Sequence, residues 1–564
     1  MARPMPLAGR DQGTPHRALR TRLERRLSGL KTERTSVVSQ WREISEYLLP
    51  TRGKYLPSPN DPGRGKRKDV RIIDSTAQQA LQHLAAGVMG GITSPSRPWF
   101  KLTVHDQSLA DSEPIKIWLD EVARRMLHLF ATSNFYQSLA VIYLELAAFG
   151  TGSMLIMEDH EDGITCHPMT VGEYFLGQDA AGRVDALYRE FVMTASQALE
   201  KFGAEGVSET VKNFCHNGRG DQEIVICHAI QKPPVGVELP PLLRKLPYIG
   251  AYWEAGNQDK VFMELRGFHE FPVCAPRWIT VGNEVYGTGP GMNAIGDVRQ
   301  LQLMQLRADQ ALDKMVNPPL VGPMQLKNEP WSTVPGGMTF LDGIAQAGMR
   351  PLYEVRAPFA EMLERIREVQ GRIKSVFFED LFLMVSQLDT VRTATEISER
   401  RNEKLLMLGP VLENLQKELL KPAIDRTFDI MRRMGLLPKP PAQLGGQELQ
   451  IEYVSILAET QRAVGTTGLE RMAGYVGNLA GVFPQVLDKI DPDALITTYN
   501  DMLGNTPKLI VDDAKVEEIR KARAKQIQNQ QNMQNSMAAV QGAKLLSETE
   551  TGAGQNALQS MMGL

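Results

Sequence analysis

The residues whose types and spacing come nearest to a reactive site are two Cys–His pairs, Cys215–His216 and Cys227–His228. Thiolate and imidazole are the usual ligands of zinc, and the two pairs together would supply a Cys2His2 set. Zinc sites, however, space their ligands as C-x2–4-C and H-x3–5-H, and neighbouring residues of a strand point to opposite faces. We therefore interpret these cysteines as buried strand residues rather than metal ligands, and extend that interpretation to His160, Cys166 and His167.

Motifs of the common enzyme classes are missing. The sequence lacks the loop G-x-x-x-x-G-K-[ST], which cradles nucleotide phosphates, and it lacks G-x-S-x-G, H-E-x-x-H and the kinase set. Arg219–Gly220–Asp221 matches an adhesion tripeptide, but its glycine-rich surroundings predict a plain turn. We expect no catalytic residue, no metal and no cofactor, and we predict that the chain is not an enzyme.

Composition narrows the class of protein further. Hydrophobic residues make up 42% and charged residues 23% of the 564 residues, which is ordinary for globular domains, and the length allows three or four modules. The net charge of −3 speaks against a protein that clamps nucleic acid by bulk positive charge. It does not argue against a channel through which DNA slides, where strong phosphate contacts would act as a brake. Four cysteines make no disulfide framework and indicate folding in a reducing, intracellular setting.

No segment predicts a signal peptide or a membrane span. The N-terminus has arginines but no apolar h-region. The most apolar window, Leu139–Met157, is interrupted by Glu145 and by Gly150–Thr151–Gly152, so we expect a buried helix followed by a strand.

Two strongly charged helical segments dominate the middle of the chain, Thr288–Val316 and Pro358–Phe378. The first ends at Asn317–Pro318–Pro319, because proline lacks a backbone donor and disfavours helix at the preceding residue. Such helices bridge solvent or pack against copies of themselves. We weigh an exposed helical hairpin against a ring of subunits whose polar helix faces line a wet channel. In the first helix one narrow apolar stripe is predicted on an otherwise polar surface, at Leu301, Met304, Ala308, Ala311 and Met315.

Between and after these helices the pattern changes. A proline- and glycine-rich segment, residues 318–356, predicts a small β-type tip carried on the two stalks. A third helix is predicted to start at Thr393, whose hydroxyl can form a capping box with Glu396. It continues towards Met434, and we expect kinks at Pro410 and Pro422.

The flanking regions complete a chain of α+β class that is mainly α. Residues 153–277 alternate with a period near two and predict a β-rich insertion holding one helix, Thr194–Phe202. The tail from Ser547 is expected to be loose. The Gln/Asn-rich helix at 511–546 has sparse apolar residues, so we favour self-association into a bundle over a frayed terminus. Further helices are predicted over residues 17–49, 75–89, 113–132, 134–149, 458–478 and 483–505, and strands over 99–104 and 449–454.

Several short motifs, taken in order, carry a family resemblance. They are Arg71–Ala77 (RIIDSTA), Ser94–Phe100 (SPSRPWF), Phe149–Gly152 (FGTG), Tyr286–Pro290 (YGTGP) and Val391–Glu396 (VRTATE). Together with the order of stalk helix, tip, stalk helix, loop and kinked long helix, the chain resembles the portal (head–tail connector) proteins of short-tailed, podovirus-type bacteriophages. The resemblance spreads over about residues 20–435.

The resemblance implies a phage portal fold with wing, stem helices, clip and crown, assembling as a dodecameric ring around a central channel. It implies the following division of the chain: a disordered N-terminus (1–16), wing (17–287), stem helix 1 (288–316), clip (317–356), stem helix 2 (357–379), tunnel loop (380–392), kinked long wing helix (393–437), wing or crown (438–505), and a C-terminal crown or barrel helix with a loose tail (506–564).

Functional positions are also implied by the resemblance. The tunnel loop would face DNA with Val385, Ser386, Gln387, Leu388, Asp389, Thr390 and Val391, and Thr393 and Glu396 would cap the long helix. The clip would meet the terminase and then the tail adaptor with Lys327, Glu329, Trp331 and Arg350. In the stem, the implied positions are Arg299, Arg307, Glu364, Arg367 and Arg372.

Such a protein would sit at one vertex of the capsid in the virion, after assembly in the host cytoplasm. It would be the channel for genome packaging and ejection and the site of head–tail attachment. The implied partners are other copies of the chain, viral double-stranded DNA, the large terminase, tail adaptor or nozzle proteins, and the major capsid and scaffolding proteins, with no membrane.

Two alternatives remain open at this point. A DNA-processing enzyme of the packaging machinery would show ATP hydrolysis or Mg²⁺-dependent DNA cleavage. A tail or adaptor protein that is not a portal would run as a monomer, whereas a ring would be roughly ten-fold heavier than the chain.

Overall fold

The computed structural model describes residues 14–56, 72–104, 106, 112–257, 261–316, 320–321, 350–351, 358–381, 408–441, 444, 449–453, 469–479, 483, 485, 491–503, 511, 513–548, 550–551 and 555–556. They form two compact units. Unit 1 comprises Met1–Phe100, Ala123–Pro438 and Tyr453–Leu457, and unit 2 comprises Lys101–Val122, Lys439–Glu452 and Ala458–Leu564. Most elements are helices, with some antiparallel sheets, so the α+β, mainly α class is confirmed.

The largest sheet of unit 1 has five antiparallel strands, β4 (Tyr174–Gln178), β5 (Val184–Thr194), β6 (Glu223–Gln231), β7 (Tyr248–Glu254) and β8 (Glu264–Phe268), in that order. Side chains alternate between its faces, so each face has its own core. On one face Tyr188, Ala229 and Trp253 pack against leucines of α1 (Thr14–Tyr47). On the other, Ile226 and Tyr252 pack beneath α6 (Ala195–Gly206) and α7 (Glu209–His216).

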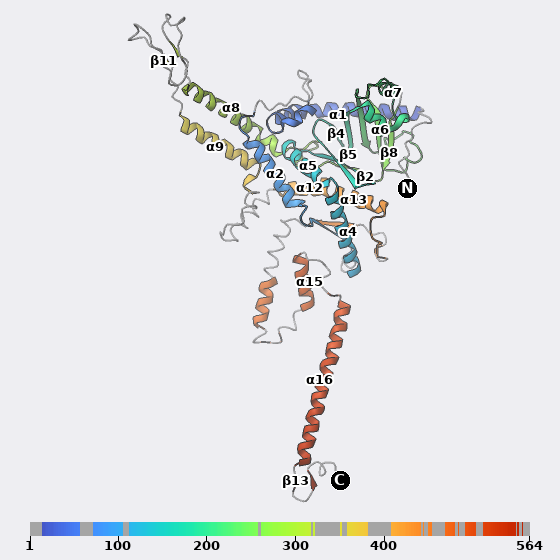
Figure 1. The fold of residues 1–564 in the computed structure, drawn as a ribbon, viewed down its shortest axis with the longest axis vertical. Coiled ribbons are helices and arrows are strands. Elements are labelled where there is room, and N and C mark those ends of the chain that lie inside the picture. The colour runs from blue at the N-terminus through green and yellow to red at the C-terminus, as the bar shows by residue number, and fades with distance from the viewer. Residues whose placement is uncertain are drawn as a thin grey trace. The chain divides into compact units, whose positions relative to one another are not determined.

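A second sheet, two further helices and the second half of a third also belong to unit 1 (Figure 1). The sheet has the order β3 (Gly163–Met169), β2 (Ser153–Asp159), β9 (Val273–Cys274). The predicted helices are confirmed as α2 (Thr76–Ile92), α4 (Glu113–Thr132) and α5 (Phe135–Phe149), and the bounds of α4 are those predicted. A short 3-10 helix, Pro50–Tyr55, follows α1.

The two charged central helices are α8 (Pro290–Val316) and α9 (Phe359–Val376), close to the predicted bounds. They lie side by side and project together from the rest of unit 1 (Figure 1). Two short strands, β10 (Leu320–Val321) and β11 (Arg350–Pro351), pair antiparallel beyond their far ends. This pairing is consistent with the predicted β-type tip on two stalks.

The surface of α8 departs from the predicted single stripe. Leu301 is buried together with Val298 and Gln302, but Met315 is 46% exposed. Leu303 and Leu306 are 55% and 40% exposed and lie on the side of the helix away from Leu301. The prediction of a polar surface outside the stripe was therefore wrong, because these leucines form a second apolar strip.

The long helix before Gly435 has an interruption. It comprises α12 (Gly409–Leu415), a π-helical segment (Gln416–Leu420) and α13 (Lys421–Met434). The backbone N–H of Lys421 donates to the carbonyl of Gln416, five residues back, and Pro422 has no N–H to donate. The irregularity expected at Pro422 is therefore a π segment, while Pro410 stands in the first turn of α12, where a missing donor costs nothing.

Unit 2 is dominated by a single helix, α16 (Asp513–Glu548), whose described side chains are almost all exposed. Asp493 of α15 (Pro492–Leu503) forms a two-armed ion pair with Arg520 of α16, with both N–O distances 2.7 Å. β1 (Phe100–Val104) pairs with β12 (Leu449–Tyr453). The predicted loose tail contains a pair of two-residue strands, β13 (Glu550–Thr551) and β14 (Gln555–Asn556).

Two predictions in the β-rich region need correction. It holds two helices rather than one, because Ser208 caps α7 by accepting a hydrogen bond from the backbone N–H of Val211. Cys215 and His216 consequently lie on a helix and not on a strand. All four cysteines are free thiols. Within the described residues, no helix is long and apolar enough to cross a membrane.

Candidate functional site

The two glycine motifs FGTG (149–152) and YGTGP (286–290) lie in contact at the N-terminal end of α8. Helix α5 ends at Gly150, whose φ of 74° lies in the left-handed region that favours glycine. A Cβ atom at Gly150 would lie 2.3 Å from the carbonyl oxygen of Gly287 and 2.6 Å from the amide nitrogen of Gly289. FGTG and YGTGP therefore need glycine for the same reason, which is that their backbones lie in contact.

Hydrogen bonds fix this contact. The hydroxyl of Thr151, fully buried, accepts from the backbone N–H of Gly287 at 2.8 Å. The backbone N–H of Trp278 donates to the carbonyl of Gly150 at 2.9 Å. A Cβ atom at Gly291, in the first turn of α8, would lie 2.3 Å from the carbonyl of Ala148. The start of α8 is thus held directly against the last turn of α5.

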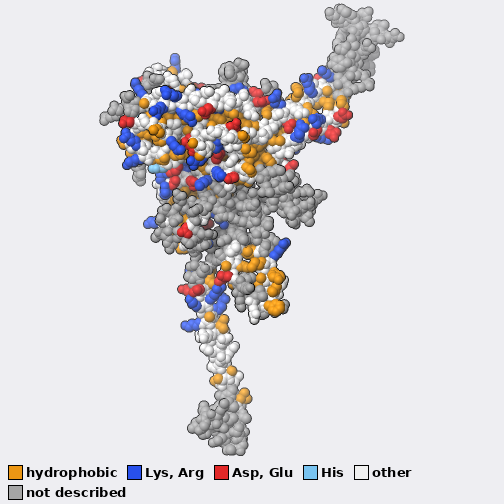
Figure 2. All heavy atoms as spheres, turned by 180° about the vertical axis from the view of Figure 1, so that it is seen from behind, with side chains coloured by type: hydrophobic (Ala, Val, Ile, Leu, Met, Phe, Trp, Pro, Cys, Tyr) orange, Lys and Arg blue, Asp and Glu red, His pale blue; other side chains and the backbone are white. Residues whose placement is uncertain are grey.

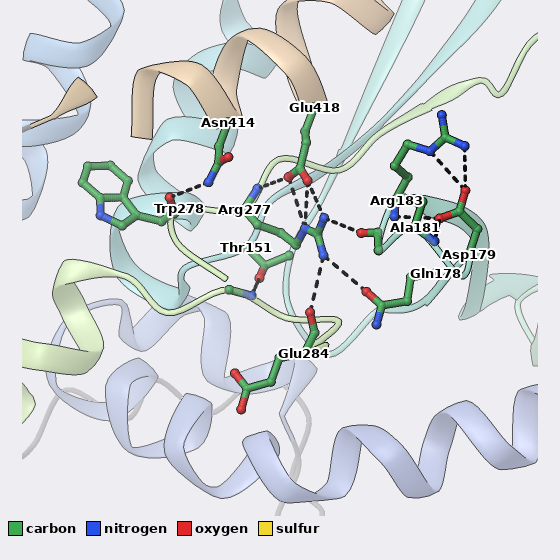
Figure 3. Close-up of polar contacts among 12 residues, drawn as sticks. Thr151, Gln178, Asp179, Ala181, Arg183, Arg277, Trp278, Glu284, Asn414 and Glu418 are labelled. Carbon is green, nitrogen blue, oxygen red and sulfur yellow. Dashed lines mark hydrogen bonds and ion pairs between the residues drawn. The ribbon is translucent and has the colours of Figure 1, made fainter. Parts of the chain in front are cut away.

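Arg277 connects this junction to the long helix (Figure 3). Its backbone N–H donates to Glu418 Oε2 at 2.9 Å and its Nε to Glu418 Oε1 at 3.1 Å, and its Nη2 also contacts that carboxylate. Glu418 lies in the π segment. A second bond, from the Asn414 amide to the Trp278 carbonyl at 3.3 Å, joins α12 to the same loop.

The same guanidinium reaches the turn between β4 and β5. Arg277 Nη2 donates to the carbonyl of Gly182 at 2.8 Å. That turn is shaped by Asp179, whose carboxylate accepts from the backbone N–H groups of Ala181 and Arg183, both at 2.9 Å. These bonds, with the first contribution from Arg183, lower the pKa of Asp179. One arginine, 5% exposed, thus ties together the loop before α8, the sheet and the long helix.

The RIIDSTA motif anchors both projecting helices. Gln302 of α8 accepts from the backbone N–H groups of Ile73 and Asp74 at 2.7 and 2.9 Å, and donates to the Asp74 carbonyl at 2.8 Å. Gln370 of α9 donates to Asp74 Oδ2 at 2.8 Å, while Asp74 Oδ1 accepts from the Thr76 N–H that starts α2. The motif therefore holds α8 and α9 at a common point.

The exit from α9 is anchored to α2. Phe378 has a φ of 54°, the left-handed region, and among the described residues it is the one non-glycine with a positive φ. Glu379, 4% exposed, then contacts His83 Nδ1 at 2.7 Å. The end of α9 is thereby fixed just before the segment predicted as the tunnel loop.

Of the predicted stem residues, two make ion pairs within the chain. Arg299 of α8 lies 2.9 Å from Glu43 of α1, and Arg372 of α9 lies 2.9 Å from Asp297 of α8. Arg307 donates to Gln310 at 3.2 Å on its own helix. Glu364 and Arg367 are exposed on α9.

The other predicted positions divide into two groups. The tunnel-loop residues 385–391, the cap residues Thr393 and Glu396, and the clip residues Lys327, Glu329 and Trp331 lie outside the described residues. Arg350 lies in β11, opposite Val321 of β10. Sequence reasoning missed Arg277 and Glu418, because a buried arginine and its distant partner leave no local pattern.

The Cys–His pairs do not come together as a metal centre. Cys227 and His228 lie on opposite faces of β6, as expected for adjacent strand residues, and burial raises the pKa of the Cys227 thiol to about 12. In the part of the chain that the structure describes, no group of three or more His, Cys, Asp and Glu side chains is placed to hold a metal ion.

Comparisons with known proteins identify the family to which the chain belongs. The family model "Bacteriophage head to tail connecting protein" matches residues 20–511. The chain is 43% identical over 534 residues to the "Portal protein" of Salmonella phage epsilon15, which covers 94% of this chain and 96% of that protein. It is also 43% identical over 516 residues to the "Probable portal protein" of Bordetella phage BPP-1, covering 91% and 92%.

A solved chain titled "Virion of native gene transfer agent (GTA) particle" is 11% identical, with a TM-score of 0.30, over 74% of this chain and 89% of that one. A likeness at that level carries no weight. The family match and the two relatives confirm the family predicted from the sequence: this chain is a member of the bacteriophage head to tail connecting protein family.

Proposed function

We propose that this protein is a phage portal that forms a ring at one capsid vertex, and that its central channel serves genome packaging, genome ejection and head–tail attachment. The observation that carries the proposal is the 43% identity to the epsilon15 portal protein over 94% of this chain. Identity at that level over nearly the full length of both chains makes a different role for the fold difficult to reconcile with the sequence.

Exposed apolar side chains support assembly from several copies. Leu303 and Leu306 of α8 and Leu363 of α9 are 40% to 55% exposed on helices that project from unit 1. Figure 2 shows that charged side chains of both signs surround apolar ones on these helices. A projecting helical pair with apolar residues on more than one side is typical of an element that is covered by neighbouring subunits.

The long helix α16 supports the same proposal independently. Apolar side chains recur along it and are 49% to 68% exposed: Ile519, Ile527, Met533, Met537, Val540 and Leu545. A solitary helix with such residues in water gains little from them, whereas packing against copies of itself would bury them. We infer that α16 forms the crown or barrel of the ring.

The charge balance of α8 suits a channel wall. Arg299, Arg307 and Lys314 are offset by Asp297, Asp309 and Asp313. Strong positive excess would retain DNA through its phosphates, so a balanced wall would let DNA move. We infer that α8 and α9 are the stem, residues 317–356 the clip that meets the terminase and then the tail adaptor, and residues 380–392 the tunnel loop.

The remaining divisions follow the same scheme. Residues 17–287 and the long helix would form the wing, 438–505 the wing or crown, and the ring would have twelve-fold symmetry in the virion. Capsid and scaffolding proteins would surround it during assembly.

The test is the mass and shape of the purified full-length protein. Light scattering after size exclusion should give a species roughly ten-fold heavier than the 62.8 kDa chain, and negative-stain images should show rings with a central hole. The double variant L303E/L306E should weaken the ring, whereas Q310E, which adds charge at an exposed polar position of α8, should leave it intact. A compact monomer without a pore, or ATP hydrolysis by the pure protein, would overturn the proposal.

A further inference from the structure

A row of polar side chains crosses the face of the five-stranded sheet opposite α1. Arg189 of β5 lies directly opposite His228 of β6, and His228 lies opposite Tyr252 of β7. The His228 and Tyr252 rings stack, with centroids 3.8 Å apart and planes 5° from parallel. Basic side chains are frequent on the end of unit 1 farthest from the projecting helices (left in Figure 2).

Arg189 is immobilised by two contacts that leave part of its guanidinium free. Its Nε donates to Nδ1 of His228 at 3.0 Å, and its guanidinium carbon lies 4.7 Å from the centre of the Phe191 ring. An arginine fixed in this way keeps its two Nη groups in a rigid fork, the geometry that matches an oxyanion. Within the described residues those Nη groups have no acceptor.

His228 can accept this bond because it is neutral. It is 1% exposed, and its pKa is held well below its ordinary range by burial first and then by Arg189, Arg266 and Lys201. Since Nδ1 accepts, the ring proton is on Nε2, which is buried and has no hydrogen-bond partner in the described part of the chain. The imidazole therefore positions Arg189 without supplying a compensating negative charge.

Other charges around the row do not neutralise it. Lys201 of α6 lies 5.4 Å from the centre of the Tyr252 ring, and Arg189 lowers its pKa after the larger effect of burial. The pKa of His167 is lowered by burial, Arg189 and Lys201. Glu264, the carboxylate that opposes this lowering of the Lys201 pKa, accepts from Arg266 Nε at 2.8 Å. Among the described residues, the carboxylate that acts on Lys201 is thus already bonded to another cation.

We propose that Arg189 and Lys201 form a binding site for a phosphate group, with the Arg189 fork and the Lys201 ammonium as its donors and His228 as the residue that positions Arg189. A fixed guanidinium fork with a second positive charge beside the His228–Tyr252 ring stack matches a doubly charged tetrahedral oxyanion. The phosphate can be free or part of a DNA backbone, and the site does not depend on ring formation.

The experiment uses the purified full-length protein and isothermal titration with sodium phosphate, at an ionic strength matched with sodium chloride. Saturable binding is expected, weakened about ten-fold or more in R189Q and in K201Q, because each loses one charge-assisted bond. R183Q is the matched control, since Arg183 carries the same charge in the turn directly before β5 but pairs with Asp179. A labelled DNA duplex, competed with phosphate, distinguishes the source: competition assigns the site to backbone phosphate, and phosphate binding alone assigns it to the free ion.

The role of His228 has its own readout. H228L should lower phosphate affinity while H228Q, whose amide oxygen can accept from Arg189, should restore much of it. Circular dichroism and the assembly state show whether each variant is folded. Absence of saturable phosphate and duplex binding, or equal losses in R183Q and R189Q, would overturn the proposal.

Discussion

Glu418 accepts hydrogen bonds from both the backbone and the side chain of Arg277, a residue 141 positions earlier in the chain. The arginine is 5% exposed and its other donors reach Gly182 and Glu284. Removing one partner of a buried ion pair is more damaging than replacing both, because the remaining charge is left unpaired. This pair is therefore a sensitive point of the fold.

The first prediction concerns that pair. E418A should destabilise the protein by about 3 kcal/mol, since Arg277 would keep a buried, partly unsatisfied guanidinium. The measurement is the thermal unfolding midpoint. E413A is the control, because the Glu413–Lys417 pair lies in the same helical stretch but is exposed, and its loss should change little. Equal effects of the two variants would contradict the role assigned to Arg277.

A second prediction compares two glycines to separate the cost of a left-handed backbone from the cost of a close backbone contact. Gly150 and Gly435 both have a φ near 70°, but a Cβ atom would meet three backbone atoms at Gly150 and nothing within 4 Å at Gly435. G435A should cost about 1 kcal/mol, the left-handed penalty alone. G150A should cost several times more, because α5 and the start of α8 would have to separate. Similar unfolding midpoints for the two variants would refute the contact argument.

The third prediction is a pH dependence. Glu145 of α5 is buried, lies 2.8 Å from Arg52 and accepts from the Thr170 hydroxyl at 2.8 Å. Burial raises its pKa to about 7, against 4.5 for an ordinary glutamate, although Arg52 and Thr170 oppose the rise. The folded state thus retains a proton that the unfolded chain has released, so this group's contribution to stability is complete below about pH 4.5 and falls as the pH rises towards 7.

The variant E145Q should remove that part of the pH dependence. Chemical unfolding of the wild type and of E145Q at several pH values between about 4.5 and 8 provides the measurement. Between about pH 4.5 and 7, the difference in unfolding free energy between the wild type and E145Q should change by at most about 1.4 kcal/mol per pH unit. Above that range the difference should be constant. E200Q, at an exposed glutamate of α6 with no ion pair among the described residues, is the control variant. A difference that is constant across the window would exclude the shifted pKa.

A fourth prediction concerns the anchor of the projecting helices. Q302L would leave two backbone donors and one carbonyl of residues 73–74 without their partner, at a cost of about 2–3 kcal/mol. Hydrogen exchange should become faster at the Ile73 and Asp74 amides. Q305L, one turn further along α8, removes only a bond to Asp309 and should leave those amides protected. Unchanged exchange in Q302L would show that the motif is held by other contacts.

The sequence predicted elements whose determinants are local. The bounds of α4 agree with the prediction, and α8 and α9 differ from it by a few residues at most, because periodicity and prolines near their ends specify them. Helix α7 was missed, since eight residues with one buried side chain, Val211, give too little periodicity to stand out in a β-rich stretch. Its signal was Ser208 followed by Glu209, a cap with an acidic first turn.

Long-range contacts could not be predicted. FGTG and YGTGP were recognised as motifs, but their meeting at Gly150 and Gly287 depends on the fold of the residues between them. The Arg277–Glu418 pair and the Arg189–His228 bond join residues with no shared local pattern. The second apolar strip of α8, at Leu303 and Leu306, was missed because the first stripe already accounted for a helix with one packed side.

The π segment also sets how α13 is rotated about its own axis relative to α12. A helix turns about 100° per residue, so one extra residue in the turn at 416–420 rotates α13 by that angle relative to α12. In this phase Arg426 and Arg433 both reach Glu270, at 2.9 and 2.7 Å. Shortening that turn by a single residue would direct the two arginines away from their carboxylate, so chain length here matters more than the identity of any side chain in the turn.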